Sequence, residues 1–181
     1  PDFGDPSNPQ ENLVTLKETI GKLSKNGIRF GMDVVDNHTG EGSAETDPSL
    51  CYRLLDNSTY YLLNPNNKAG YDDASGCGNA FNTNNPVVLN MMTKYKEMYA
   101  LMGVRLFRHD LMAAAARNEE TREFDPNSAY MQIFNNSAIL STIKEKEGID
   151  VVAEGYMATG GVKGVRSYFT DDFHKDIFTW N

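Results

Sequence analysis

The sequence predicts an α/β domain built around a parallel β-sheet. Segments with helical spacing alternate along the chain with short apolar segments that are typical of buried strands. Two of these apolar segments end in a carboxylate, Asp110 and Glu154. The 181 residues include 40% hydrophobic and 10% aromatic residues, which excludes disorder as the default interpretation. Since neither a repeat nor a linker divides the chain, we predict a single domain over residues 1–181.

The first half of the chain predicts a helix, a strand and a long loop. After a loop over residues 1–9, apolar residues in segment 13–23 recur at helical spacing, and an Asn-Gly pair ends this helix. Segment 28–35 is mostly apolar and predicts a buried strand. Residues 40–85 are polar with little periodicity, and this length exceeds ordinary connections, so we expect a functional insertion or binding loop there.

The second half repeats the alternation. Pro86 opens a helix that leads into a strand over 104–110. A further helix is predicted over 128–147 and a strand over 149–154. A glycine-rich loop and a short strand or helix follow, up to residue 169. Alternating units of this kind build a parallel sheet with right-handed crossovers.

Charge and cysteine content limit the possible partners. The chain has 17 Lys and Arg against 25 Asp and Glu, with an isoelectric point near 4.8. This balance argues against nucleic acid and anionic membranes and is more compatible with a neutral ligand. Cys51 and Cys77 lack metal-ligand spacing, and whether they pair stays open.

Asp110 and Glu154 are the first candidate site residues. They close consecutive predicted strands, so both are expected at the carboxyl end of the sheet, within the roughly 5 to 5.5 Å that a retaining glycosidase needs. Arg108 precedes Asp110 by two residues and would share its face, which favours an ionised nucleophile. Glu154 has no cation within three residues, and its apolar approach would raise its pKa toward that of a general acid. The alternative is that Arg108 and Asp110 form only a structural ion pair.

Asn37 and His38 follow the strand that carries Asp33. A histidine there can hydrogen-bond a sugar hydroxyl, and the asparagine can order the loop through side-chain contacts or calcium. A metal cluster of Asp33, Asp36, Asn37 and His38 is a weaker alternative, because the spacing identifies no second group of ligands.

Several segments carry a resemblance to a known family. Residues 33–39 (DVVDNHT), 107–111 (FRHDL) and 152–155 (VAEG) resemble, in order, three sequence signatures of the α-amylase superfamily, glycoside hydrolase family thirteen. Three further segments resemble isoamylases and glycogen-debranching enzymes: residues 57–63, 75–79 and 84–88. The likeness covers nearly the whole chain.

The resemblance implies a fold and a reaction. The fold would be a partial (β/α)8 TIM-type barrel, about strands three to six. The reaction would be retaining hydrolysis of α-1,6 branch linkages in glycogen or starch-type α-glucans, with Asp110 as nucleophile, Glu154 as acid/base and Arg108 holding the nucleophile ionised. No cofactor is implied beyond a possible calcium ion, and the compartment stays open, with cytoplasm or plastid suggested by the family.

Binding residues are carried over in the same way. The resemblance implies sugar contacts from His38 and Asn37, with Asn37 and Asp33 also giving structural support. Tyr60 and Tyr61, like Tyr71, could stack on glucose rings, and the alternative is that these loop tyrosines are packing residues.

The sequence also departs from the family pattern. Asp36 stands where Tyr or Phe is usual, and Arg105 and His109 replace other residues on or near a buried strand without an obvious partner. His109 and His174 are expected to have no role in the site. The His-Asp pair of the fourth signature is not found after Glu154.

Half a barrel would leave two sheet edges open. We therefore expect a fragment of a larger enzyme, a pruned derivative, or a protein that self-associates through these edges. The rival hypothesis is a catalytically inactive α-glucan-binding or scaffold domain that keeps the fold.

Overall fold

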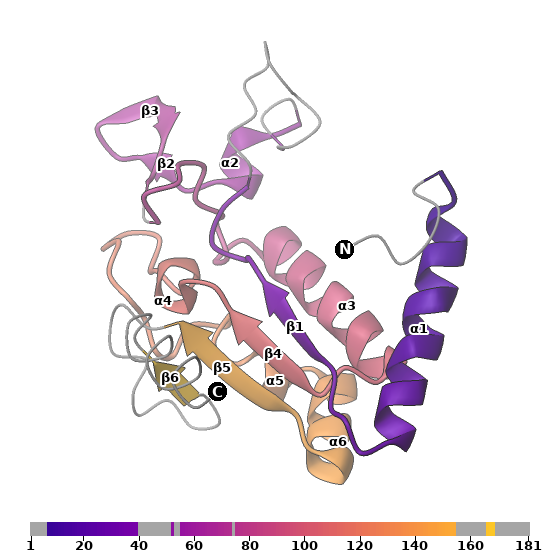
Figure 1. The fold of residues 1–181 in the computed structure, drawn as a ribbon. Coiled ribbons are helices and arrows are strands. Elements are labelled where there is room, and N and C mark those ends of the chain that lie inside the picture. The colour runs from indigo at the N-terminus through magenta and orange to yellow at the C-terminus, as the bar shows by residue number, and fades with distance from the viewer. Residues whose placement is uncertain (1–6, 40–51, 53–54, 74, 155–165, 169–181) are drawn as a thin grey trace, which may run out of the picture.

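The structure is a computed structural model that describes residues 7–39, 52, 55–73, 75–154 and 166–168 (Figure 1). The predicted glycine-rich loop, the C-terminal tail with His174, and Cys51 lie outside these residues. Cys77 is exposed. No helix within the described ranges is long and apolar enough to cross a membrane.

A four-stranded parallel sheet forms the centre of the fold, as predicted. Its strands are β1 (Gly31–Val34), β4 (Leu106–His109), β5 (Asp150–Glu154) and β6 (Arg166–Tyr168), and they lie in this order across the sheet. The strands also follow this order in the chain, so each new strand adds to the same edge. The last predicted element is therefore a strand, and the predicted first strand is shorter than expected.

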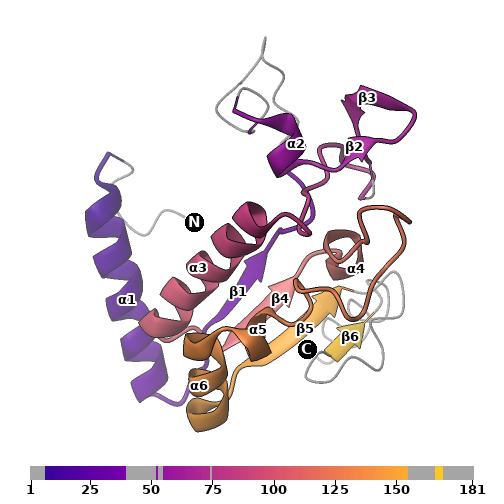
Figure 2. The same ribbon diagram turned by 180° about the vertical axis from the view of Figure 1, so that it is seen from behind.

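Helices cover one face of the sheet. Figure 2 shows α3 (Pro86–Met102), α5 (Ile133–Asn136) and α6 (Ala138–Glu147) in front of the strands, with α1 (Pro9–Lys25) beside α3. The helix predicted over 128–147 was wrong as one element, since it is split at Ser137. The Ser137 backbone is extended, which ends α5. Its hydroxyl accepts a hydrogen bond from the Leu140 backbone N–H at 3.1 Å, so Ser137 is the N-cap of a new helix, α6.

The core fills the space between this face and the helices. Alternate strand residues point toward the helices, so the buried positions on β4 and β5 are Phe107, His109, Val151 and Ala153. The rings of Phe107 and Phe134 lie 5.3 Å apart between their centroids. The helices add further buried apolar side chains: Val88, Met92, Ala100 and Leu140.

The predicted long loop is partly regular. Its described second half contains α2 (Asn57–Tyr60) and a hairpin of β2 (Leu63–Asn64) and β3 (Asn67–Tyr71), which lie beyond the carboxyl ends of the strands (Figure 1). Asp56 starts α2, because its carboxylate accepts the backbone N–H groups of two following residues. These elements are too short to leave a periodic sequence signal.

Two polar residues that were expected to lack partners have them. Arg105 forms an ion pair with Glu147 at the end of α6 and donates to the Ala100 carbonyl at 2.7 Å. His109 is buried, and its Nδ1 lies 2.9 Å from the Tyr130 hydroxyl. The compensating groups come from other elements, so local sequence could not reveal them.

Gly103 ends α3 in a conformation that favours glycine. Its φ is +111°, and a Cβ at this position would lie 2.8 Å from Ile20 Cγ2. The left-handed conformation satisfies the last turn, because the Gly103 N–H donates to the Ala100 carbonyl.

We expect Gly103→Ala to lower the free energy of unfolding by about 1–3 kcal/mol, through backbone strain and the clash with Ile20. Gly21→Ala, in α1 with no atom within 4 Å of the added Cβ, is the matched control. It should be neutral or stabilise the protein by up to about 1 kcal/mol. Urea denaturation of both variants measures this, and equal effects would contradict the assignment.

Candidate active site

The register of the sheet places the two candidate acids side by side. Arg108 on β4 lies opposite Asp33 on β1 and Val152 on β5. Asp110 and Glu154 each follow two residues later on their strands, so they emerge on the same face at the same level. This is the face away from the helices, at the carboxyl end of the sheet.

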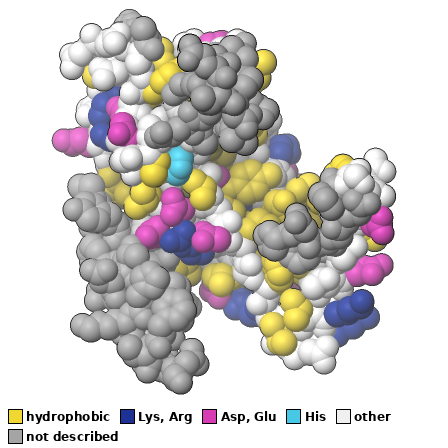
Figure 3. Space-filling view, turned by 45° about the horizontal axis from the view of Figure 1, so that its top comes forward, with side chains coloured by type: hydrophobic (Ala, Val, Ile, Leu, Met, Phe, Trp, Pro, Cys, Tyr) yellow, Lys and Arg dark blue, Asp and Glu magenta, His cyan; other side chains and the backbone are white. Residues whose placement is uncertain are grey.

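The Arg108 guanidinium lies between three carboxylates. Its Nη1 donates to Asp33 Oδ1 at 2.7 Å and to Asp110 Oδ1 at 3.2 Å, and its Nη2 donates to Glu154 Oε2 at 2.7 Å. Figure 3 shows this patch of acidic and basic side chains with a histidine and hydrophobic side chains around it. The sequence has no cation within three residues of Glu154, but Arg108 reaches it across the strands.

The environment of Asp110 favours its ionised form. Partial burial raises the pKa of Asp110, but hydrogen bonds from Asn37 and Glu154 and the charge of Arg108 outweigh this and hold the pKa below its usual value of 3.8. Leu111, which follows, has φ +38° and begins the turn into α4 (Met112–Ala115). The chain therefore turns away from β4 directly after Asp110, through a left-handed backbone conformation that is uncommon for leucine.

Asn37 and His38 act as a pair. Asn37 is fully buried, and its Nδ2 donates to the Asp110 carbonyl at 2.8 Å and to Asp110 Oδ2 at 3.0 Å. Its Oδ1 therefore accepts from Nδ1 of His38, which fixes the tautomer of this half-buried ring. Asn37 thus positions the Asp110 carboxylate from a fully buried site, and the sugar contact expected of it stays a prediction.

The three tyrosines considered for sugar stacking, Tyr60, Tyr61 and Tyr71, differ in exposure. Tyr61 is 1% exposed, its ring is stacked on Phe81, and its hydroxyl contacts Thr39, so this side chain packs in the core and cannot stack on a sugar in this structure. Tyr60 is half-buried and stacks on Tyr52 with 4.5 Å between ring centroids. Tyr71 is also half-buried and meets Tyr61 edge-on.

A cavity of about 880 Å³ opens beside Glu154. Its lining is mainly apolar and comes from the segment after Asp110, from loop 117–124 and from the long insertion. The lining includes Leu111, Ala113, Ala114, Phe124 and Gly76. A concave, mainly apolar surface next to a carboxyl group is the usual form of a small-molecule site.

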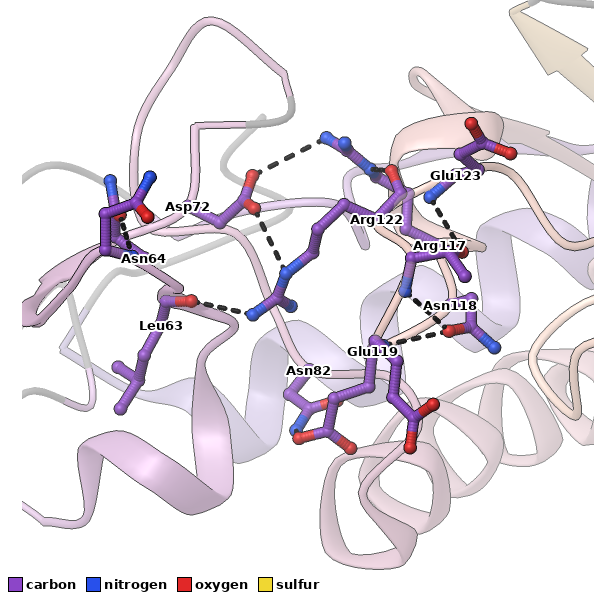
Figure 4. A network of polar contacts seen from close by, with 12 residues as sticks. Leu63, Asn64, Asp72, Asn82, Arg117, Asn118, Glu119, Arg122 and Glu123 are labelled. Atoms are coloured by element: carbon purple, nitrogen blue, oxygen red, sulfur yellow. Dashed lines mark hydrogen bonds and ion pairs between the residues drawn. The ribbon is translucent and has the colours of Figure 1, made fainter.

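Asp72 clamps the wall of this cavity (Figure 4). Its carboxylate lies 3.5 Å from Arg117 Nη1 and 3.6 Å from Arg122 Nε. Arg122 also donates through Nη2 to the Leu63 carbonyl at 2.7 Å. These contacts tie loop 117–124 to the β2–β3 hairpin, so two segments distant in sequence form one wall.

A second polar network lies on the helix side of the sheet, and the sequence did not predict it. Asp36 is 2% exposed and accepts hydrogen bonds from Lys96, Tyr95 and Tyr130. Burial raises the pKa of Asp36, but the charge of Lys96 and the contact with His109 outweigh it and hold the pKa well below its ordinary value. Burial and the charge of Lys96 lower the pKa of His109 and outweigh the contact with Asp36, which raises it.

The structure does not gather the residues of the proposed metal cluster. Asp33 pairs with Arg108 and Asp36 with Lys96, on opposite faces of the sheet. Within the described part of the chain, no group of three or more His, Cys, Asp or Glu side chains is placed to hold a metal ion.

Comparisons with known proteins agree with this geometry. Isoamylase 1 (chloroplastic) from Oryza sativa subsp. japonica is 41% identical over 122 residues, which cover 67% of this chain and 15% of the relative. A glycogen debranching enzyme from Yersinia pseudotuberculosis is 40% identical over an aligned length of 188 residues, covering 100% of this chain and 25% of the relative. The chain thus spans a quarter or less of the length of these relatives. No family model matches it.

Solved structures show the same fold. A pullulanase from Paenibacillus barengoltzii, in complex with maltohexaose and α-cyclodextrin, superposes with a TM-score of 0.64 over 89% of this chain and 24% of that protein, at 21% identity. These findings define the class: the chain belongs to the α-amylase superfamily, glycoside hydrolase family thirteen. Within that superfamily its homologues are isoamylases and glycogen debranching enzymes, as the signatures predicted.

The lowered pKa of Asp110 predicts a specific dependence of stability on pH. Because this pKa falls on folding, the carboxylate stabilises the native state above its unfolded pKa of 3.8, and the contribution is lost as the pH drops toward the lower folded value. Wild-type protein should therefore lose more unfolding free energy between about pH 5 and about pH 3 than Asp110→Asn. Parallel losses in urea denaturation would contradict the electrostatic assignment.

Proposed function

We propose that this chain provides the catalytic acids of a retaining glycoside hydrolase that cleaves α-1,6 branch linkages in glycogen or starch-type α-glucans. The observation that carries the proposal is the contact of one guanidinium with two neighbouring carboxyl groups, Asp110 and Glu154. The homology to isoamylases and glycogen debranching enzymes supports the linkage and the substrate class.

Asp110 is the nucleophile in this proposal. Arg108 and Asn37 hold its carboxylate ionised and aimed away from the strand. Its attack on the anomeric carbon of the branch glucose would form a β-glycosyl enzyme and expel the glycosidic oxygen.

Glu154 is the general acid and base. Asp110 is the carboxyl group held ionised, and Glu154 is its neighbour on the same guanidinium. In this proposal Glu154 carries the proton that passes to the leaving oxygen. The same carboxylate would then accept a proton from the water that hydrolyses the glycosyl enzyme.

The separation of the acids supports retention. Both carboxyl groups contact the same guanidinium, Asp110 through Nη1 at 3.2 Å and Glu154 through Nη2 at 2.7 Å. Two acids that share one guanidinium fit the roughly 5–5.5 Å spacing of a retaining enzyme better than the roughly 6.5–9.5 Å of an inverting enzyme, which fits a water molecule between acid and base. Double displacement therefore fits the site better than single displacement.

His38 and the cavity would hold the sugar. The Nδ1 atom of His38 is engaged by Asn37, so Nε2 is the ring atom left to meet a hydroxyl of the glucose that is attacked. The cavity touches Glu154, which protonates the leaving oxygen, so we assign it to the leaving glucan chain. Phe124 offers an aromatic surface for a glucose ring there.

The proposed function also implies a domain organisation. We propose that residues 1–181 form one partial catalytic-barrel domain that corresponds to about strands three to six of a (β/α)8 barrel. The parallel order of β1, β4, β5 and β6 supports this assignment. Open sheet edges would then be where further strands or a second copy pair.

We expect the full-length protein to release new reducing ends from pullulan and amylopectin but not from debranched glucan. Asp110→Asn and Glu154→Gln should each lower kcat by about 100-fold or more. Proton NMR should show the α-anomer as the first product, as retention requires. Binding of branched glucan without turnover would instead favour an inactive glucan-binding domain.

Phe124→Ala should weaken maltohexaose binding about three- to tenfold, because an aromatic contact contributes roughly 0.5–1.5 kcal/mol. Leu101→Ala is the control, since Leu101 is 64% exposed on α3 and does not line the cavity. Isothermal titration calorimetry measures both variants. Unchanged affinity in Phe124→Ala would remove the cavity from the glucan-binding site.

A further inference from the structure

We propose that the buried network of Asp36, Lys96, Tyr95, Tyr130 and His109 is a positioning device that sets the orientation of the nucleophile Asp110 from the opposite face of the sheet. This inference rests on the proposed function of Asp110. It assigns a role to residues that never touch the substrate.

The network joins four separate parts of the fold. Asp36 follows β1, Lys96 and Tyr95 come from α3, Tyr130 from the turn before α5, and His109 from β4. Lys96 is fully buried and pairs with Asp36, and its Nζ also lies 2.7 Å from the Tyr95 hydroxyl. Three donors on one carboxylate fix the Asp36 side chain and, with it, the backbone at the end of β1.

The hydrogen bonds run in one direction. The Tyr130 hydroxyl donates to Asp36 Oδ2 at 2.8 Å, so its oxygen accepts from His109 Nδ1 at 2.9 Å. His109 Nδ1 itself lies 3.4 Å from Asp36 Oδ2. Tyr130 thus bridges the end of β1 to β4 on the helix side.

Each end of this bridge is bonded to a residue of the site. Asp36 directly precedes Asn37, and His109 directly precedes Asp110. On the other face, Asn37 donates to both the carbonyl and the carboxylate of Asp110. The two strands are therefore cross-linked twice at the same level, once beneath the sheet and once at the nucleophile.

Stability alone does not account for a buried charge pair here. Removing Lys96 and Asp36 from water carries a desolvation cost that their attraction offsets only with good geometry, and well-packed apolar replacements are often as stable or more so. A displacement of about 1 Å in a reacting group, in contrast, can cost about 100-fold in rate. The network fits that second requirement, since it restrains both strands that carry Asn37 and Asp110.

Tyr130→Phe tests the inference with least disturbance, because it removes one hydroxyl and leaves the charge pair. In the full-length protein acting on branched glucan, we expect kcat to fall about 10-fold while KM stays within about twofold. Ser137→Ala is the control: it breaks another buried hydrogen bond in the same helix layer, between Ser137 and Glu97 at 2.7 Å, and removes the N-cap of α6. Ser137→Ala should lower the unfolding midpoint at least as much and leave kcat unchanged.

A second variant separates positioning from folding. Lys96→Met alone leaves Asp36 buried without its cation, and the protein should be strongly destabilised. Combining Lys96→Met with Asp36→Asn removes both charges, so the unfolding midpoint should largely recover while kcat stays about 10-fold low. Recovery of kcat together with stability would overturn the inference, as would unchanged kcat in Tyr130→Phe. A wild-type protein without hydrolytic activity would instead count against the proposed function.

Discussion

The site depends on one cation, the guanidinium of Arg108. Three carboxylates from three neighbouring strands approach it, and without it Asp33, Asp110 and Glu154 would repel one another at the carboxyl end of the sheet. The parallel register places these three groups at the same height along their strands. The order of the strands, the helices that cover their far side and the tight turn after Asp110 all keep the groups in that position. The fold thus holds three carboxylates around the single guanidinium of Arg108.

The two faces of the sheet use polar groups differently. On the open face, Arg108 and its partners are partly exposed, and each charge keeps contact with water. On the helix face, Asp36 and Lys96 are buried, and every contact must come from protein. The open face carries Asp110 and Glu154, whereas the buried face holds Asp36 and His109, the residues that directly precede Asn37 and Asp110. Asn37 belongs to both, because it is buried and yet bonded to Asp110.

The sequence predicted the elements with strong periodicity and the residues with strong motifs. The α/β class, the sheet and the neighbouring acids follow from spacing, and the superfamily follows from three short signatures. Contacts across strands did not follow: Glu154 meets Arg108 from 46 positions away. Lys96 was also missed, since a lysine within a Lys-Tyr-Lys-Glu segment resembles a solvated helix surface. The burial of Tyr61 was not predicted either, because sequence cannot separate an exposed aromatic from one stacked on Phe81.

The ion pairs of Asp72 hold the cavity wall separately from the strands that hold the two acids. The acids stand on strands whose spacing is fixed by backbone hydrogen bonds, while the adjoining cavity wall is made of loops tied together by ion pairs. Loop length and composition can drift without moving a strand. Substitutions in the segment around Asp72 can therefore reshape the cavity wall while the sheet keeps Asp110 and Glu154 in place.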